Sequence, residues 1–202
     1  AGKFIRHLIM ETSFGRALPG SVIIYLQECF VQDWQAFSLS TQPKENRLFV
    51  DDNFRDIYDS NKCDGDFYSC MTDKDYHYFY RDSVDASAAY LKNEHGKIIA
   101  RCVIFNKVYE EGTSKIWRLA ERQYSTNQDD VLKRALVNAL IIGGYIDGYK
   151  QVGYDCHHSR SFVDIYGNSL EDKKFYIDCD LGTEDTLSYQ DSFKWYDMSE
   201  GR

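Results

Sequence analysis

The stretch AAYLKNEHGKIIARCVIFNKV, residues 88–108, decides the fold class of this chain. Two runs rich in Ile, Val, Leu and aromatic residues flank Asn93-Glu94-His95-Gly96, which has the length and composition of a hairpin loop. Branched and aromatic side chains favour extended backbone, so we predict one strand over 88–92 and a longer one over 97–108. The stretch therefore indicates an antiparallel β-hairpin.

Further elements are predicted on both sides of this hairpin. Apolar residues recur every three or four positions from Ile23 to Phe37, which predicts a helix with Ser21 as its N-cap. The strongest helical pattern runs from Leu132 to Ile146, and the polar cluster Ser125-Thr126-Asn127 caps it. A short helix is expected after Thr72. The other predicted strands cover residues 47–50, 116–124, 152–154, 162–166 and 175–179.

These elements predict an α+β fold, a mostly antiparallel sheet with helices packed on at least one face. We expect a single domain over 1–202, with a helical and acidic part at 1–66, an α+β core at 67–180 and an acidic tail at 181–202. Both prolines precede residue 45, and no Ser/Gly tract marks a linker.

Cellular location is inferred from hydropathy and cysteine usage. The longest apolar run, 136–146, is about half of the roughly 20 residues that cross a bilayer, and the N-terminus does not resemble a secretory signal. Six cysteines are spread widely through a chain that is large enough to fold without disulfides. We therefore expect a soluble cytoplasmic protein with free thiols.

The negative charge is concentrated in two segments. The net charge is -8, and residues 51–85 contribute -6 from ten Asp and four Lys or Arg. Residues 178–202 contribute -5 from seven acidic and two basic residues, so the remainder sums to +3. Clustered acids are able to mimic the phosphates of a nucleic acid and bind a basic groove, although such clusters also serve as a solubilising surface.

Cys70, in Phe67-Tyr68-Ser69-Cys70-Met71, is a candidate nucleophile because it directly precedes the short predicted helix, whose N-terminus favours a thiolate. His157 and His158 are candidate bases, far away in sequence. The alternative is a structural thiol that seats the short helix against the sheet, and we expect this role. Cysteine and histidine spacings fit no compact zinc module, and residues 59–66 depart from a calcium loop, so no metal site is predicted.

The predicted strand at 116–124 suggests a second kind of site. Strict alternation places Arg118, Ala120, Arg122 and Tyr124 on one face, where two guanidiniums and a phenol would bind phosphate or carboxylate. Arginine, histidine and tyrosine together are sufficient for metal-independent RNA cleavage. The candidate catalytic residues are Arg101, Arg122, Tyr124, His157, His158 and Cys70. A salt-bridged surface strand is the structural alternative.

Three motifs carry a resemblance to a known family. Ser69-Cys70-Met71, the strand from Gly96-Lys97 through Arg101 to Phe105, and Glu121-Arg122-Gln123-Tyr124 resemble an uncharacterised family from phages and other mobile elements. The match covers residues 69–150, with Glu121 where the family has Asp and Cys102 where it has Ala. The order of elements is also similar to the core of acetyltransferase-like folds. However, their glycine-containing pyrophosphate loop has no counterpart at 125–130.

The resemblance and the charge pattern lead to three functional expectations. The first is a phage or mobile-element accessory protein, such as an anti-CRISPR-type inhibitor, that binds a host ribonucleoprotein or its RNA. The second is a metal-independent enzyme that cleaves RNA. The third is an acyl-CoA-dependent N-acyltransferase. The sequence identifies no cofactor.

Overall fold

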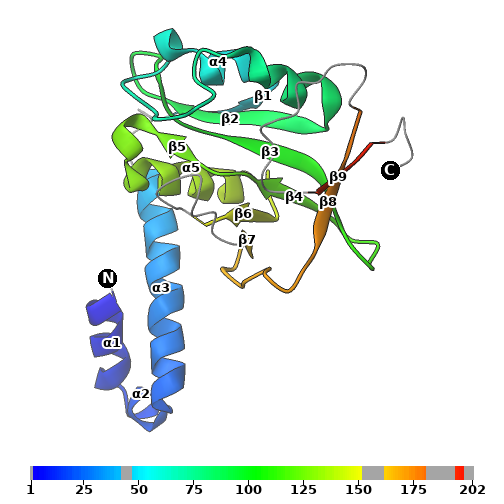
Figure 1. Cartoon of the computed structure of the whole chain (residues 1–202). Coiled ribbons are helices and arrows are strands. Elements are labelled where there is room, and N and C mark those ends of the chain that lie inside the picture. Colours follow the sequence, from blue (N-terminus) through cyan, green and yellow to red (C-terminus); the bar gives the residue numbers. More distant parts are fainter. Residues whose placement is uncertain (1, 42–46, 152–161, 181–193, 198–202) are drawn as a thin grey trace. The chain divides into compact units, whose positions relative to one another are not determined.

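A computed structural model describes residues 2–41, 47–151, 162–180 and 194–197 (Figure 1). The chain divides into two compact units, residues 1–43 and 44–202. The expected boundary at residue 66 is not where the sheet begins, because β1, Arg47–Asp51, is already one of its strands. A single domain over the whole chain stays a prediction.

The N-terminal unit is helical. It contains α1 (Gly2–Glu11), α2 (Ser13–Ala17) and α3 (Gly20–Thr41). Thr12 caps α2, because its hydroxyl accepts a hydrogen bond of 2.8 Å from the backbone N–H of Gly15. A Cβ atom at Gly15 would lie 1.8 Å from the carbonyl oxygen of Ile9, so only glycine fits this turn. The predicted helix after Pro19 is confirmed, although Ser21 lies inside it rather than at its cap.

The second unit contains a nine-stranded sheet whose main path runs β1-β2-β3-β4-β6-β7. The predicted hairpin is confirmed as β2 (Ala86–Lys92) and β3 (Ile98–Glu110), which pair antiparallel. β3 is the longest strand and also pairs with β4, β5 and β8. The remaining strands are β4 (Ile116–Ala120), β5 (Tyr124–Ser125), β6 (Gly148–Lys150), β7 (Phe162–Asp164), β8 (Phe175–Cys179) and β9 (Lys194–Asp197).

The prediction of one strand over 116–124 was wrong, because a bulge divides it into β4 and β5. Ala120 pairs with Ile104 and Tyr124 pairs with Arg101. The chain thus advances by four residues on one side of the ladder and by three residues on β3, which is the pattern of a β-bulge. The extra residue reverses the alternation of side chains. Ala120 therefore lies on one face of the sheet and Tyr124 on the other, and the predicted face shared by Arg118, Ala120, Arg122 and Tyr124 does not exist.

Arg118 has a structural role in this arrangement. Its Nε and Nη2 atoms donate hydrogen bonds of 3.1 and 2.8 Å to the two carboxylate oxygens of Asp147, and Nη1 donates to the carbonyl of Gly144 at 2.6 Å. This bidentate contact joins β4 to the segment before β6, and the strand β6 itself runs parallel to β4. Arg118 is therefore committed to holding these strands together.

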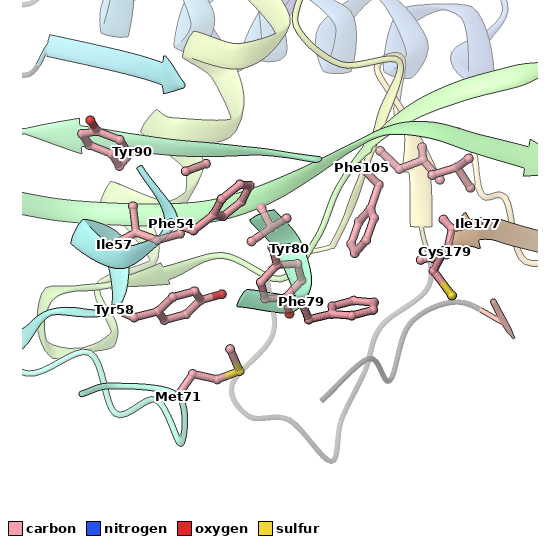
Figure 2. Packing of buried hydrophobic residues seen from close by; sticks show 14 of the residues in the cluster. Phe54, Ile57, Tyr58, Met71, Phe79, Tyr80, Tyr90, Phe105, Ile177 and Cys179 are labelled. Atoms are coloured by element: carbon pink, nitrogen blue, oxygen red, sulfur yellow. The ribbon is translucent and has the colours of Figure 1, made fainter. Parts of the chain in front are cut away.

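Helices cover both faces of the sheet. On one face, α5 (Asp130–Ile142) packs on apolar side chains of β2, β3 and β4. On the other face lie α4 (Phe54–Tyr58), a 3₁₀ turn at Asp75–His77 and a π turn at Phe79–Ser83. Figure 2 shows aromatic side chains from these elements, among them Tyr58 and Tyr80, pointing toward one another over the strands. The fold is α+β, as predicted.

Two helix predictions are corrected by local backbone geometry. The helix α5 begins at Asp130 instead of directly after Ser125-Thr126-Asn127, because Asn127 and Gln128 adopt positive φ angles of 52° and 59°. Asp129 is the N-cap, and its carboxylate accepts a 2.7 Å hydrogen bond from the N–H of Val131. The helix expected after Thr72 is two short turns, at 75–77 and 79–83.

The remaining strand predictions have mixed outcomes. The strands over 47–50, 162–166 and 175–179 are present as β1, β7 and β8. The strand expected over 152–154 lies outside the described residues. Across the described part of the chain, no helix combines the length and apolar character needed to cross a membrane.

Burial on α5 gives a test of the packing. Leu140 is 0 % exposed, whereas Ile142, two residues along the same helix, is 58 % exposed. We expect Leu140→Ala to lower the free energy of unfolding by about 2–5 kcal/mol, because it leaves a cavity between α5 and the sheet. Ile142→Ala is the matched control and should cost less than about 1 kcal/mol. Urea unfolding followed by circular dichroism measures both, and equal losses would contradict the packing of α5.

Candidate functional site

Arg101 is a buried charge in the middle of the sheet. It lies on β3 between apolar neighbours, and 1 % of its side chain is exposed. Its cross-strand partners are Tyr90 on β2 and Tyr124 on β5, so the three side chains share the face that α4 covers. An arginine in such a position is uncommon, because charged residues are seldom fully buried without a counter-charge.

Three aromatic rings surround this guanidinium, and we call Arg101, Tyr58, Phe67 and Tyr124 the Arg101 cage. The Cζ atom of Arg101 lies 4.3 Å from the ring centroid of Tyr58, 4.8 Å from that of Tyr124 and 5.4 Å from that of Phe67. Tyr58 comes from the end of α4, and Phe67 comes from the turns that follow it. The cage thus joins segments that are 66 residues apart in the chain.

The cage does not satisfy the hydrogen-bonding capacity of Arg101. The Nε and Nη2 atoms are buried, and neither makes a hydrogen bond to the described residues. A cation–π contact contributes about 0.5–2 kcal/mol, but it replaces no N–H···O bond. A buried donor without a partner costs about 1–3 kcal/mol, and more for a charged group. The aromatic rings therefore stabilise the charge of Arg101 while two of its donors stay unused.

Tyr124 lies between two guanidiniums. The Cζ atom of Arg122 is 4.8 Å from the Tyr124 ring centroid, the same distance as that of Arg101. Burial raises the pKa of Tyr124 above its usual value, and this effect outweighs the two arginines, which lower it. Tyr124 therefore keeps its proton at neutral pH. It can donate a hydrogen bond to an anion, but it cannot serve as a general base there.

Glu121 and Lys150 form a buried ion pair beside the cage, which the sequence reasoning missed. Their Oε1 and Nζ atoms are 3.5 Å apart. Gln123 holds the bulge in place, because its side-chain amide donates to the backbone carbonyls of Glu121 and Lys150 at 2.9 and 3.0 Å. No sequence signal indicated these contacts, since Lys150 is 29 residues from Glu121. They explain why the chain between β4 and β5 takes up an extra residue.

Tyr58 and Phe67 were also missed as partners of Arg101. Phe54, Ile57 and Tyr58 have helical apolar spacing, which is the one signal that placed Tyr58 on a buried face. Burial raises the pKa of Tyr58 far above its usual value, and its hydroxyl shares a hydrogen bond with Tyr80. Both phenols are therefore neutral, so neither balances the charge of Arg101.

Cys70 does not have the structural role expected for it. Its side chain is exposed, whereas Phe67 and Met71 are buried and attach this segment to the sheet. The hydroxyl of Ser69 accepts a 3.3 Å hydrogen bond from the N–H of Met71, which fixes the turn. Cys70 is close enough to Tyr124 to affect its pKa, so the structure brings Cys70, Tyr124 and the two arginines into one neighbourhood. His157 and His158 lie outside the described residues.

Three lysines close to this neighbourhood in sequence make local contacts. Lys107 pairs with Asp85 at 2.8 Å, and Lys115 lies 3.3 Å from the ring centroid of Trp117. Lys133 is buried and bonds to Asp130 at 2.9 Å. Each of these three side chains is therefore engaged by a residue of the same protein.

The segment that covers the cage is strongly acidic on its outer side. Seven of its aspartates are exposed, and we call them the acidic layer: Asp52, Asp64, Asp66, Asp73, Asp75, Asp82 and Asp85. The pKa of Asp73 is lowered by the N–H of Ser60, that of Asp82 by Arg81, and that of Asp85 by Lys107 and Asn106. These carboxylates stay ionised at neutral pH, so the layer keeps its charge.

Comparisons of this chain with protein-family models, with curated proteins and with solved structures find no match. Within the described ranges, no group of three or more His, Cys, Asp and Glu side chains is arranged to hold a metal ion. The candidate functional features are thus the Arg101 cage and the acidic layer above it.

The three thiols near the cage differ in their accessibility, which alkylation measures. Burial raises the pKa of Cys63 to about 11 from an ordinary value of 9.0, and Cys102 is fully buried with a pKa raised further. At pH 8, Cys63 therefore holds about 100-fold less thiolate than an ordinary thiol.

We expect iodoacetamide to modify exposed Cys70 first, Cys63 slowly and Cys102 only after unfolding. Peptide mapping by mass spectrometry after timed quenching measures the order. The same reaction in urea is the control, in which all three should react at similar rates. Early labelling of Cys102 in the folded protein would contradict its burial on β3.

Proposed function

We propose that the protein is an accessory protein of a phage or other mobile element that binds a host nucleic-acid-handling complex, as a counter-defence inhibitor of the anti-CRISPR type. The observation that carries this proposal is the acidic layer, seven exposed aspartates on one segment. The motif resemblance at residues 69–150 supports the mobile-element origin. The target in this proposal is the basic groove in which the complex holds its RNA.

The geometry of the layer suits this role. Several carboxylates are fixed by local hydrogen bonds, such as Asp73 to the N–H of Ser60 at 2.8 Å and Asp85 to Asn106 at 3.0 Å. Charges that are fixed in place lose less side-chain entropy when a partner binds. They also stay ionised because their pKa values are lowered. A rigid array of negative charge is what competition with a phosphate backbone requires.

RNA cleavage, the second candidate, receives less support from the cage. A strand of RNA has no access to Arg101, because 1 % of its side chain is exposed. Tyr124 keeps its proton and is suited to act as a hydrogen-bond donor or acid, but the reaction also needs a base. The candidate bases His157 and His158 are outside the described residues.

An acyltransferase, the third candidate, is favoured by one observation and disfavoured by another. The antiparallel order β2-β3-β4, followed by α5 and a strand β6 parallel to β4, is the arrangement expected of an acetyltransferase-like core. The N-terminus of α5, where such enzymes bind pyrophosphate, carries Asp129 and Asp130 instead. Two carboxylates there repel a polyphosphate. Binding therefore remains the better-supported function.

Removing charge from the acidic layer should weaken binding to the partner. The tagged chain is used to capture a partner from bacterial lysate, and captured proteins and RNA ends are identified. The double variant Asp52→Asn, Asp75→Asn then removes two exposed charges. We expect affinity for the purified partner to fall about twofold to thirtyfold at low salt, on the basis of about 0.2–1 kcal/mol per exposed ion pair. Binding should also weaken as salt rises.

The matched control is Glu94→Gln, Glu111→Gln, which makes the same change of charge at two exposed turns outside the layer. It should bind as the unmodified protein does, and an RNA oligonucleotide should compete with the protein for the partner. Equal losses in the two double variants, or binding that is insensitive to salt, would argue against the layer as the contact surface. New RNA ends at substoichiometric protein would favour the nuclease instead.

A further inference from the structure

The unused donors of Arg101 belong to one edge of its guanidinium. Nε and Nη2 are the two atoms that donate side by side, as parallel N–H groups, to a single carboxylate or phosphate. Both are buried, and both lack a hydrogen bond to the residues that the structure describes. A donor pair that is complete, charged and aligned in this way has the geometry of a recognition site for an oxyanion.

The surroundings of this edge restrict the ligand to small molecules. The faces of the guanidinium are covered by the rings of Tyr58, Tyr124 and Phe67, all within 5.4 Å of Cζ. These rings exclude water, so an ionic hydrogen bond formed beside them is stronger than one at the surface. A polymer backbone cannot approach a side chain that is 1 % exposed, whereas a small anion needs only one covering group to move.

Phe67 is the covering group best placed to move. It lies in a segment, residues 64–74, that is made of turns and bends without a regular helix or strand. The neighbouring Tyr68 has a positive φ of 47°, and Asp73 in the same segment has one of 57°. Tyr58 is on α4 and Tyr124 is on β5, so both of the other rings are attached to regular elements.

We propose that the Nε and Nη2 edge of Arg101 is a binding site for a small oxyanion, the carboxylate or phosphate group of a low-molecular-weight ligand, which enters beside Phe67. The site is separate from the acidic layer and does not depend on the proposed inhibitor function.

The test combines ligand titration with a direct signal from Arg101. Inorganic phosphate, acetate and an RNA oligonucleotide are added separately, with sodium chloride at equal ionic strength as the reference. Melting temperature and the ¹⁵N–¹H signal of the Arg101 Nε group are recorded for each. We expect phosphate or acetate to raise the melting temperature above the chloride reference and to shift the Nε–H signal. A response to phosphate indicates that the ligand binds through a phosphate group, and a response to acetate indicates a carboxylate group.

Two variants separate the site from a general salt effect. Arg101→Lys keeps the charge but loses the paired donors, and it should bind at least about tenfold more weakly. Arg134→Lys makes the same change at an exposed position on α5 and should bind normally. If Arg101→Lys does not fold, the Nε–H shift in the unmodified protein still decides the question. An unmoved Nε–H signal with every small anion, or a response to RNA alone, would overturn the proposal.

Discussion

The sheet face under α4 is packed around the buried guanidinium of Arg101, which aromatic rings shield from water. Arg101 lies near the beginning of the long strand β3, and the segments over it supply aromatic rings where an ordinary core would supply aliphatic side chains. Tyr58 and Phe67 have to reach the same point from different turns. The backbone between β1 and β2 is accordingly irregular, with Tyr58 at the end of α4 and Phe67 in the turns that follow.

The two faces of the sheet consequently differ in character. The face under α5 is packed with small and branched aliphatic residues, such as Ala100 and Ile104, in a simple helix-on-sheet layer. The opposite face is rich in aromatic residues and carries ionisable groups with perturbed pKa values, among them Tyr58, Tyr124 and Cys63. Perturbed ionisable groups gather where proteins bind ligands or carry out chemistry. The Arg101 cage lies on the aromatic face, and we place the proposed oxyanion site there for this reason.

The sequence predicted the parts of the fold that depend on local periodicity. The hairpin of β2 and β3, the helix α3 and the strand β8 follow from residue patterns within a few positions. The bulge at 121–123 was not predictable, because the contacts around it include a hydrogen bond from Gln123 to Lys150, far along the chain. Strict alternation was assumed through it, and the predicted arginine face was wrong for this reason.

The candidate site was predictable only in part. Arg101, Arg122, Tyr124 and Cys70 were selected from motifs, and the structure places them near one another. Their environment depends on tertiary contacts that leave little trace in the sequence. Cys70 was expected to pack against the sheet, but it is exposed. Arg101 was selected as a candidate catalytic residue, but it is buried.

The bulge also makes the site depend on the number of residues as well as on their identity. With three residues between Ala120 and Tyr124, the tyrosine faces Arg101 because the bulge takes up one of them; without the bulge, a strand of the same length would turn its ring toward α5. Loss of the bulge at the present length would exchange the two faces of the residues that follow up to the helix, whereas deletion of its extra residue would leave the tyrosine opposite Arg101. A related chain that keeps the cage therefore needs either this length with a bulge or one residue fewer without it.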